Sequence, residues 1–214
     1  MKTDNALIIG AKTPTDANGV VCRVCPGEYV DVVREGECLG DKIYISSLLK
    51  AEDDLDEIVD YCLENNAKVM VCAGDDLYDS GVLEAREHLS PVMFLHKIGL
   101  LDRNCSVVGG ICLDRDDADL MAQTGSSLIV CPTYSCGTGR GIPIITPALG
   151  KIKISLATFD NRFNKNGSML EEAKTLYLGT NAVMRKQNAL SIERLAEIVG
   201  DVSPEELFES LNLK

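Results

Sequence analysis

The chain has 214 residues, with 21 Lys and Arg against 33 Asp and Glu, a formal net charge of −12, and 45 % apolar residues. This length is typical of one globular domain, or of one domain with a small appendage. The basic residues form no run, and phosphate binding needs clustered Lys and Arg, so the composition argues against nucleic acid and anionic membranes as partners. No apolar stretch approaches the length of about 18 residues that a membrane-spanning helix requires.

The nine cysteines are an odd number, and most of them lie within apolar runs. This usage favours reduced thiols over a disulfide framework. The apolar run at residues 6–11 follows Asp4 and is too short for a signal peptide. We therefore predict a cytoplasmic protein.

The chain divides into two parts by its pattern of apolar residues. In residues 1–41, short β-type runs at 6–9, 20–24 and 29–33 are separated by Gly and Pro, which predicts a small N-terminal β element. In residues 42–214, apolar strands alternate with amphipathic stretches. This pattern predicts a second unit in which strands and helices alternate.

Five strands are expected in that second unit, at residues 43–46, 68–73, 106–111, 127–131 and 152–158. Helices are expected at 55–63, 81–88, 92–98, 116–123, 169–184 and 192–199, with a last one starting at Ser203. Each connection is long enough for a crossover, so the strands form a parallel sheet with helices on its outer face. The fold class is therefore α/β.

Four segments in one order point to a known family. They are SPVMFLHKIGLL at residues 90–101, Leu113 and Asp114 followed by an acidic helix, TGSSLIVCPT at 124–133, and the glycine-containing segment 139–143. The chain resembles the C-terminal half of amidohydrolase-superfamily proteins, in particular the cytosine, S-adenosylhomocysteine and chlorohydrolase-like deaminases. The resemblance covers about residues 42–200. It implies a partial (β/α) TIM-barrel-like domain and, if the protein is active, a hydrolase acting on C–N bonds.

The metal ligands of that family are the main departure from the resemblance. The family holds its metal with an H-x-H on the first strand, His residues on the fifth and sixth strands, and an Asp on the eighth. The chain contains no H-x-H, and residues 1–41 are too few for the first three strands and their helices. The remaining ligand positions fall on Met70 or Cys72, on Gly109, on Cys112, and next to Asp160.

The two histidines, His88 and His96, lie in predicted helical segments away from these positions. The usual zinc or iron site therefore cannot be built from this chain, and we expect no cofactor. An alternative remains open, in which cysteines at the carboxyl ends of the strands hold Zn or Fe, because thiolates suit both metals.

Functional side chains in a barrel-like sheet come from the carboxyl ends of the strands. The candidate catalytic residues at these ends are Cys72, Asp75, Cys112 and Asp160. The alternative for the cysteines is simple burial, since Cys is a small apolar residue.

Two polar loops are candidates for binding a ligand. The segment 136–141 is rich in glycine and carries one cation, so its backbone N–H groups and guanidinium suit an anion. It contributes Cys136, Thr138 and Arg140, and the loop before the helix at 169–184 contributes Asn161 and Arg162. The simpler interpretation of the segment 136–141 is a mobile connection, and that of the loop before the helix is an ordinary capped turn.

Three functions remain open from the sequence. In the first, which we favour, the chain is a degenerate amidohydrolase-like protein that binds a small ligand or a partner without metal-dependent hydrolysis. In the second, it is an active hydrolase or deaminase with a rebuilt Cys and Asp site. In the third, it is an assembly protein whose open strand edges are covered by self-association.

Overall fold

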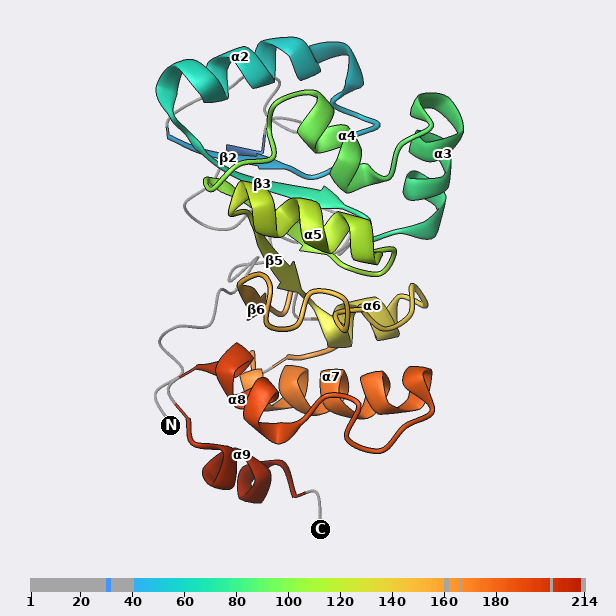
Figure 1. Ribbon diagram of the computed structural model, residues 1–214, viewed down its shortest axis with the longest axis vertical. Helices are drawn as coiled ribbons and strands as arrows, with labels where there is room; N and C mark the ends of the chain where they lie inside the picture. Colours follow the sequence, from blue (N-terminus) through green and yellow to red (C-terminus); the bar gives the residue numbers. More distant parts are fainter. Residues whose placement is uncertain (1–29, 32–40, 160–161, 166, 201, 213–214) are drawn as a thin grey trace, which may run out of the picture.

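The computed structural model describes residues 30–31, 41–159, 162–165, 167–200 and 202–212 (Figure 1). Most of the predicted N-terminal element, and the candidate residues Asp160 and Asn161, lie outside these ranges. The division of the chain at residue 41 stays a prediction. No helix in the described ranges is long and apolar enough to cross a membrane.

Strands and helices alternate along the chain, as the sequence predicts. The strands are β1 (Val30–Asp31), β2 (Lys42–Ile45), β3 (Lys68–Ala73), β4 (Cys105–Gly109), β5 (Ser127–Val130) and β6 (Ile154–Leu156). A single 3-10 turn, η1 (Glu52–Asp54), precedes the first described helix. The helices are α2 (Leu55–Asn65), α3 (Leu77–Glu87), α4 (Pro91–Lys97), α5 (Arg115–Thr124), α6 (Pro132–Gly137), α7 (Met169–Met184), α8 (Ile192–Val199) and α9 (Pro204–Leu211).

The strands form one parallel sheet in sequential order, from β1 to β6. Sequential parallel order requires each connection to cross over on the same side, which is the arrangement of a (β/α) barrel segment. Among the described strands the sheet is not closed, since β1 and β6 are its two edges. The predicted fold class is confirmed.

The sheet has two apolar faces of different composition. On β3, Val69 and Val71 belong to the large core shared with the helices, whereas Met70 and Cys72 point to the opposite face. That second cluster takes residues from all of β2 to β5 and from the segment after β6, and α6 is the one described helix that contributes to it, through Tyr134. The alternation of period two along each strand thus separates a helix-covered face from an inner face.

Local sequence signals fix most helix ends. Ser168, Ser191 and Ser203 each accept a hydrogen bond from a first-turn backbone N–H, which starts α7, α8 and α9 at the predicted residues. Gly125 ends α5 in the left-handed conformation, which is the usual role of glycine at that position.

The structure corrects two local predictions. The segment 136–141 is not a loop throughout, because Cys136 and Gly137 form the end of α6. Pro132 is the first residue of α6, a position that favours proline. It directly follows the strand predicted at 127–131, so the sequence pattern did not indicate a helix there. The last strand is shorter than 152–158 and spans only Ile154–Leu156.

Candidate functional site

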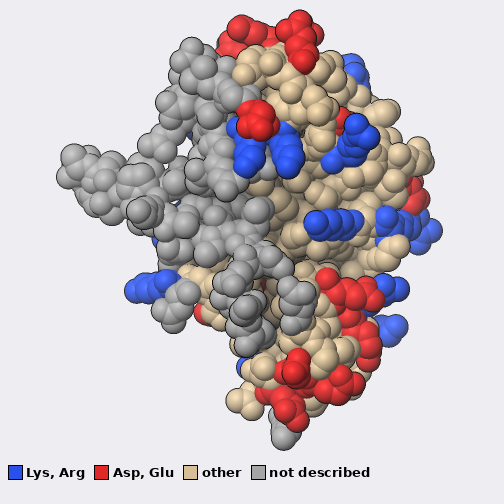
Figure 2. All heavy atoms as spheres, turned by 90° about the vertical axis from the view of Figure 1, so that its left-hand side faces the viewer, with Lys and Arg blue, Asp and Glu red and all other residues tan. Residues whose placement is uncertain are grey.

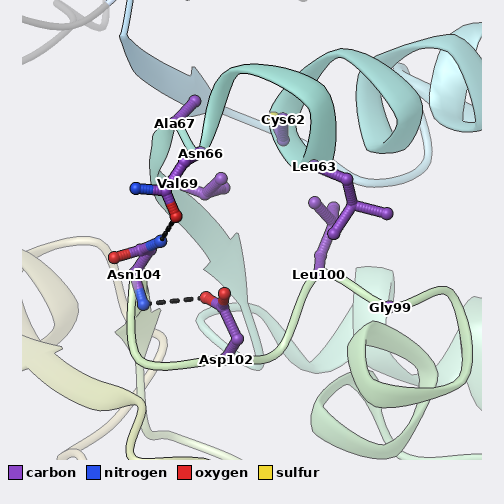
Figure 3. Close-up of a pocket in the computed structure, with 9 residues that line it drawn as sticks. All are labelled: Cys62, Leu63, Asn66, Ala67, Val69, Gly99, Leu100, Asp102 and Asn104. Carbon is purple, nitrogen blue, oxygen red and sulfur yellow. Dashed lines mark hydrogen bonds between the residues drawn. The ribbon is translucent and has the colours of Figure 1, made fainter.

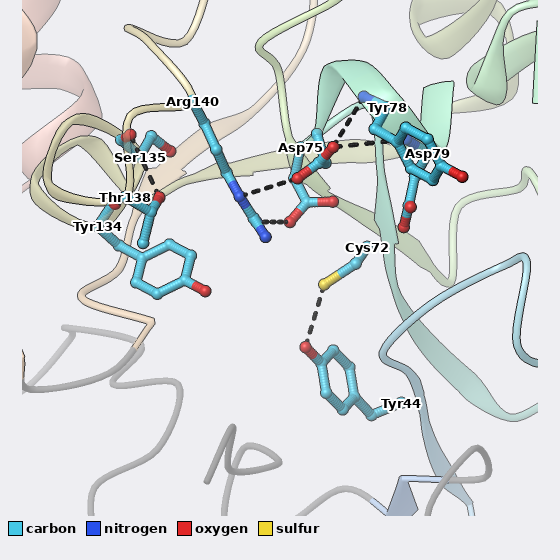
Figure 4. A network of polar contacts seen from close by, with 10 residues as sticks. Tyr44, Cys72, Asp75, Tyr78, Asp79, Tyr134, Ser135, Thr138 and Arg140 are labelled. Atoms are coloured by element: carbon cyan, nitrogen blue, oxygen red, sulfur yellow. Dashed lines mark hydrogen bonds and ion pairs between the residues drawn. The ribbon is translucent and has the colours of Figure 1, made fainter. Parts of the chain in front are cut away.

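Residues from three loops lie at the carboxyl ends of the strands, and Figure 4 shows the loop after β3 and the loop after α6. Asp75 and Asp76 follow β3, Cys112 follows β4, and Arg140 follows α6 beyond β5. Parallel strands all present their carboxyl ends at one edge, so side chains distant in sequence become neighbours there.

Arg140 joins the loop after β3 to the loop after β5. Its Nη1 lies 2.6 Å from Oδ2 of Asp75, and its Nε lies 3.2 Å from Oδ2 of Asp76. The side chains of Arg140 and Asp75 are 21 % and 12 % exposed, so the pair is only partly screened by water. One guanidinium therefore pairs with two carboxylates, and its second terminal nitrogen, Nη2, lies outside these two ion pairs.

Tyr134 is the aromatic centre of the same region. Its ring packs against Phe159 with centroids 4.3 Å apart, and the ring of Phe163 approaches at 6.4 Å in an edge-to-face arrangement. The guanidinium carbons of Arg140 and Arg162 lie 5.3 Å and 5.6 Å from the Tyr134 centroid. Both distances are within cation–π range, so two of the predicted ligand-binding residues share one aromatic platform.

The two candidate catalytic cysteines lie in different settings. The Cys72 thiol is buried on the inner face, 3.0 Å from the hydroxyl of Tyr44 (Figure 4). Cys112 is half-buried, and desolvation by burial raises the pKa of its thiol. A raised pKa keeps a thiol protonated near neutral pH, which weakens it both as a nucleophile and as a metal ligand.

Gly109, at the end of β4, is packed too tightly for any side chain. A Cβ atom at this position would lie 2.7 Å from the backbone nitrogen of Asp75 and 2.9 Å from the carbonyl oxygen of Ala73. Its φ of +141° also lies in a region that residues other than glycine rarely adopt. A metal-binding side chain therefore cannot be accommodated at residue 109 without moving the end of β3.

The donor set at this edge does not fit a zinc or iron site. No group of three or more His, Cys, Asp or Glu residues within the described ranges is arranged to hold a metal ion. At the positions where the resemblance places ligands, Gly109 has no side chain and no room for one, and Phe159 is an apolar core residue. Asp75 is held by Arg140.

The remaining predicted ligand-binding residues are only partly brought together. The Thr138 hydroxyl donates to the carbonyl of Tyr134 at 2.8 Å, so it caps the end of α6. Cys136 is exposed, and its sulfur lies 3.8 Å from the carbonyl oxygen of Gly141.

Sequence reasoning missed two residues of this region, Tyr134 and Glu172. Glu172 on α7 is fully buried and accepts hydrogen bonds from the Thr133 backbone N–H at 2.9 Å, from the Thr133 hydroxyl, and from Asn164 Nδ2 at 2.8 Å. It thereby ties α7 to the start of α6. The acidic first turn of α7 resembled a solvated helix start, and no local signal distinguished Glu172 from Glu171.

A pocket lies at the opposite end of the sheet, beside the start of β3 (Figure 3). It is small, about 50 Å³, and its wall includes a hydrogen bond of 2.9 Å from Asn104 Nδ2 to Asn66 Oδ1. Asp102 accepts from the Asn104 backbone N–H at 2.8 Å. These bonds close the loop before β4, so the pocket has room for water and for little else.

Comparison with known sequences confirms the resemblance. The chain is 21 % identical over 145 residues, 67 % of its length, to a 5-methylthioadenosine/S-adenosylhomocysteine deaminase of Caldicellulosiruptor saccharolyticus. It is 32 % identical over 87 residues, 40 % of its length, to a protein of the same name from Halothermothrix orenii. These matches cover 34 % and 20 % of the two relatives, so the chain spans about a third or less of the proteins that it matches. No family model matches the chain.

Comparison with solved structures shows the same fold. A zinc-bound adenosine deaminase from Xanthomonas campestris superposes with a TM-score of 0.67 at 15 % identity, over 73 % of this chain and 36 % of that one. An atrazine chlorohydrolase from Arthrobacter aurescens, complexed with zinc, gives a TM-score of 0.64 at 15 % identity, over 79 % and 37 % of the two chains. The described sheet and helices therefore have the fold of part of an amidohydrolase- and deaminase-type barrel.

Proposed function

We propose that this chain is a degenerate amidohydrolase-like protein that binds a small anionic molecule at the carboxyl ends of β3, β5 and β6 and does not carry out metal-dependent hydrolysis. The packing of Gly109 against Asp75 carries this proposal. An added Cβ at 2.7 Å from a backbone nitrogen leaves no space for the ligand that the resemblance places there.

The geometry supports an anionic ligand with a flat apolar part. Arg140 and Arg162 both lie over Tyr134, and Phe163, which is 40 % exposed, extends the aromatic surface. A guanidinium presents a planar fork of N–H donors that matches a carboxylate, and an aromatic face accepts a flat ring. Ion pairing with Asp75 and Asp76 holds Arg140 in place before any ligand arrives, which lowers the entropy cost of binding.

Zinc titration of the full chain tests the absence of a metal site. We compare the wild type with a Cys72→Ser, Cys112→Ser double variant under reducing conditions, and measure bound zinc by elemental analysis after desalting. Because the remaining cysteines are present in both proteins, the comparison isolates the two thiols at this edge. We expect the same zinc content in both; a loss of one zinc per chain in the double variant would contradict the proposal.

Binding of benzoate, with benzamide as the uncharged control, tests the ligand site. We expect benzoate to shift the NMR signals of the aromatic residues at this edge, and Arg162→Gln to weaken its affinity about tenfold, a loss of about 1.4 kcal/mol. Lys165→Gln, on the same loop, is the matched control and leaves the affinity unchanged. Equal binding of benzoate and benzamide, or equal affinity in the two variants, would overturn the assignment of an anion site.

An active hydrolase with a rebuilt site has less support. Asp75 is tied to Arg140, the Cys72 thiol contacts Tyr44, and burial raises the pKa of the Cys112 thiol. A nucleophile needs an adjacent base or a lowered pKa. The raised pKa of Cys112 and the pairing of Asp75 with Arg140 both oppose such an arrangement.

A further inference from the structure

A row of basic side chains crosses the amino-terminal edge of the sheet, at the end opposite the proposed ligand site. We call it the basic row, and it comprises Lys42, Lys68, Arg103, Lys151, Lys153 and Arg194. Figure 2 faces the side of the molecule where β3 begins, and shows Lys and Arg across the middle with Asp and Glu above and below. This gathering is unusual in a chain of net charge −12.

The strand register explains why these residues are neighbours. Lys42 and Lys68 are paired at the starts of β2 and β3. The backbone N–H of Val69 donates to the carbonyl of Asn104 at 3.0 Å, which places Arg103 next to Lys68 along the edge. The backbone N–H of Leu128 donates to the carbonyl of Lys153 at 2.9 Å, which brings Lys153 beside the start of β5. Adjacent strands lie about 4.8 Å apart, so the row is continuous across the edge.

Three of these cations are unpaired within the part of the chain that the structure describes. Lys68, Arg103 and Lys153 are exposed and have no ion pair there, whereas Lys151 pairs with Asp119 and Arg194 with Glu197. Lys151, Lys153 and Arg194 also line a cleft of about 370 Å³, together with Ile152, Ile198 and the acidic Glu197. Asp41, beside Lys42, and Asp102, beside Arg103, are the acidic groups next to the other end of the row.

The opposite charge lies on α2. Asp56, Asp60 and Glu64 are exposed and spaced by four residues, so they share one side of this helix. Asp53, Asp54 and Glu57 extend the acidic surface, and α2 carries no Lys or Arg. In Figures 1 and 2, α2 lies at the top of the molecule and the basic row below it, so one copy presents both charges on adjacent surfaces.

We propose that the basic row is an interface for a second copy of this chain, and that its occupant is the acidic side of α2 from that copy. Two copies related by a two-fold axis make this contact twice, because each offers its basic row to the α2 of the other. Charge complementarity of this kind fixes partner and register. The overall repulsion between two chains of charge −12 acts over a longer range and is largely screened at about 0.1 M salt, where the Debye length is about 10 Å.

A charge-exchange experiment tests the proposal on the full chain. The first variant reverses the row with Lys68→Glu, Arg103→Glu and Lys153→Glu, and the second reverses α2 with Asp56→Lys, Asp60→Lys and Glu64→Lys. Molar mass is measured by light scattering at about 0.1 M salt and about 1 M salt, where the Debye length falls to about 3 Å. Far-UV circular dichroism confirms that each variant is folded.

We expect the wild type to be a dimer at the lower salt and a monomer at the higher salt. Each variant alone is a monomer, and an equimolar mixture of the two regains the dimer, because the reversed row of one then faces the reversed α2 of the other. Matched controls with the same charge changes elsewhere stay dimeric: Lys50→Glu, Arg115→Glu and Lys186→Glu for the row, and Glu171→Lys, Glu205→Lys and Glu209→Lys for α2.

Three results would overturn the proposal: a wild type that is monomeric at the lower salt, a dimer that neither variant disrupts, or variants that fail to associate when mixed. Binding of a heparin-like polyanion to the row of a monomeric wild type is a fourth such result, since it would assign the row to a different class of partner.

Discussion

Gly109 and Asp75 approach so closely that a Cβ atom on Gly109 would lie 2.7 Å from the Asp75 backbone nitrogen. Asp75 in turn holds Arg140, so the end of β4, the loop after β3 and the loop after α6 form one packed unit. Residue 109, where the sequence resemblance implies a metal ligand, is thus closed to a side chain by Asp75 and by the end of β3.

Gly109→Ala is expected to destabilise the protein by about 2–4 kcal/mol, because it combines backbone strain with a steric clash that cannot relax cheaply. Gly139→Ala is the matched control, since Gly139 also has a positive φ, of +75°, but a Cβ there meets nothing within 4 Å. The control should lose about 1–2 kcal/mol, from backbone strain alone. Urea unfolding of the three proteins measures the difference, and equal losses would show that the contact with Asp75 is not tight.

The pair of Arg140 and Asp75 is expected to contribute a coupling energy of about 1–2 kcal/mol, since both groups are partly buried. A double-mutant cycle with Arg140→Gln and Asp75→Asn measures it. The ion pair of Arg86 with Glu52 provides the comparison, because its side chains are 45 % and 43 % exposed. We expect a smaller coupling energy there, because water screens an exposed pair. A larger coupling in the exposed pair would contradict the role given to Arg140.

Glu172 should make stability depend on pH. Burial raises the pKa of its carboxyl group, although hydrogen bonds from Thr133 and Asn164 oppose the shift. Because the pKa is higher in the folded protein than in the unfolded chain, the stability linked to this group is fully present at pH values below the ordinary glutamate pKa. It is lost as pH rises through the folded-state value. Thermal unfolding of the wild type should show this loss, and Glu172→Gln should not.

Removing the carboxyl of Glu172 altogether has a different consequence. Glu172→Ala leaves the buried N–H of Thr133 without its acceptor, and we expect a loss of about 3 kcal/mol. Glu171→Ala is the matched control, because Glu171 is the exposed neighbour in the same helical turn. It should cost no more than about 0.5 kcal/mol in the same urea unfolding series.

The described cysteines should react with iodoacetamide in an order set by exposure. Cys136 is exposed and Cys112 is half-buried, whereas Cys62, Cys72, Cys105 and Cys131 are buried. Burial raises the pKa of Cys136 as well as that of Cys105, so alkylation of Cys136 should accelerate as pH rises toward its pKa. Peptide mapping by mass spectrometry at several pH values gives the rates. Alkylation of Cys105 before Cys136 would show that the start of β4 opens in solution.

The sequence by itself determined the parallel α/β order and the bounds of α7 and α8. These depend on apolar periodicity and on serine caps, which act over a few residues. The lack of an H-x-H motif in these 214 residues could also be found from the sequence, because it is a matter of residue identity.

Only the tertiary structure decided how the candidate residues meet. Arg140 and Asp75 are 65 residues apart and become partners because parallel strands end at one edge. In the sequence, Tyr134 is one residue of an apolar segment and Glu172 is one acidic residue of a helix start, so neither is distinguished from its neighbours. The contact between α6 and α7 gives them their roles. The basic row has the same origin. Apart from Lys151 and Lys153 its members are distant in the sequence, and the register of the strands and the packing of α8 on β6 bring them to one edge.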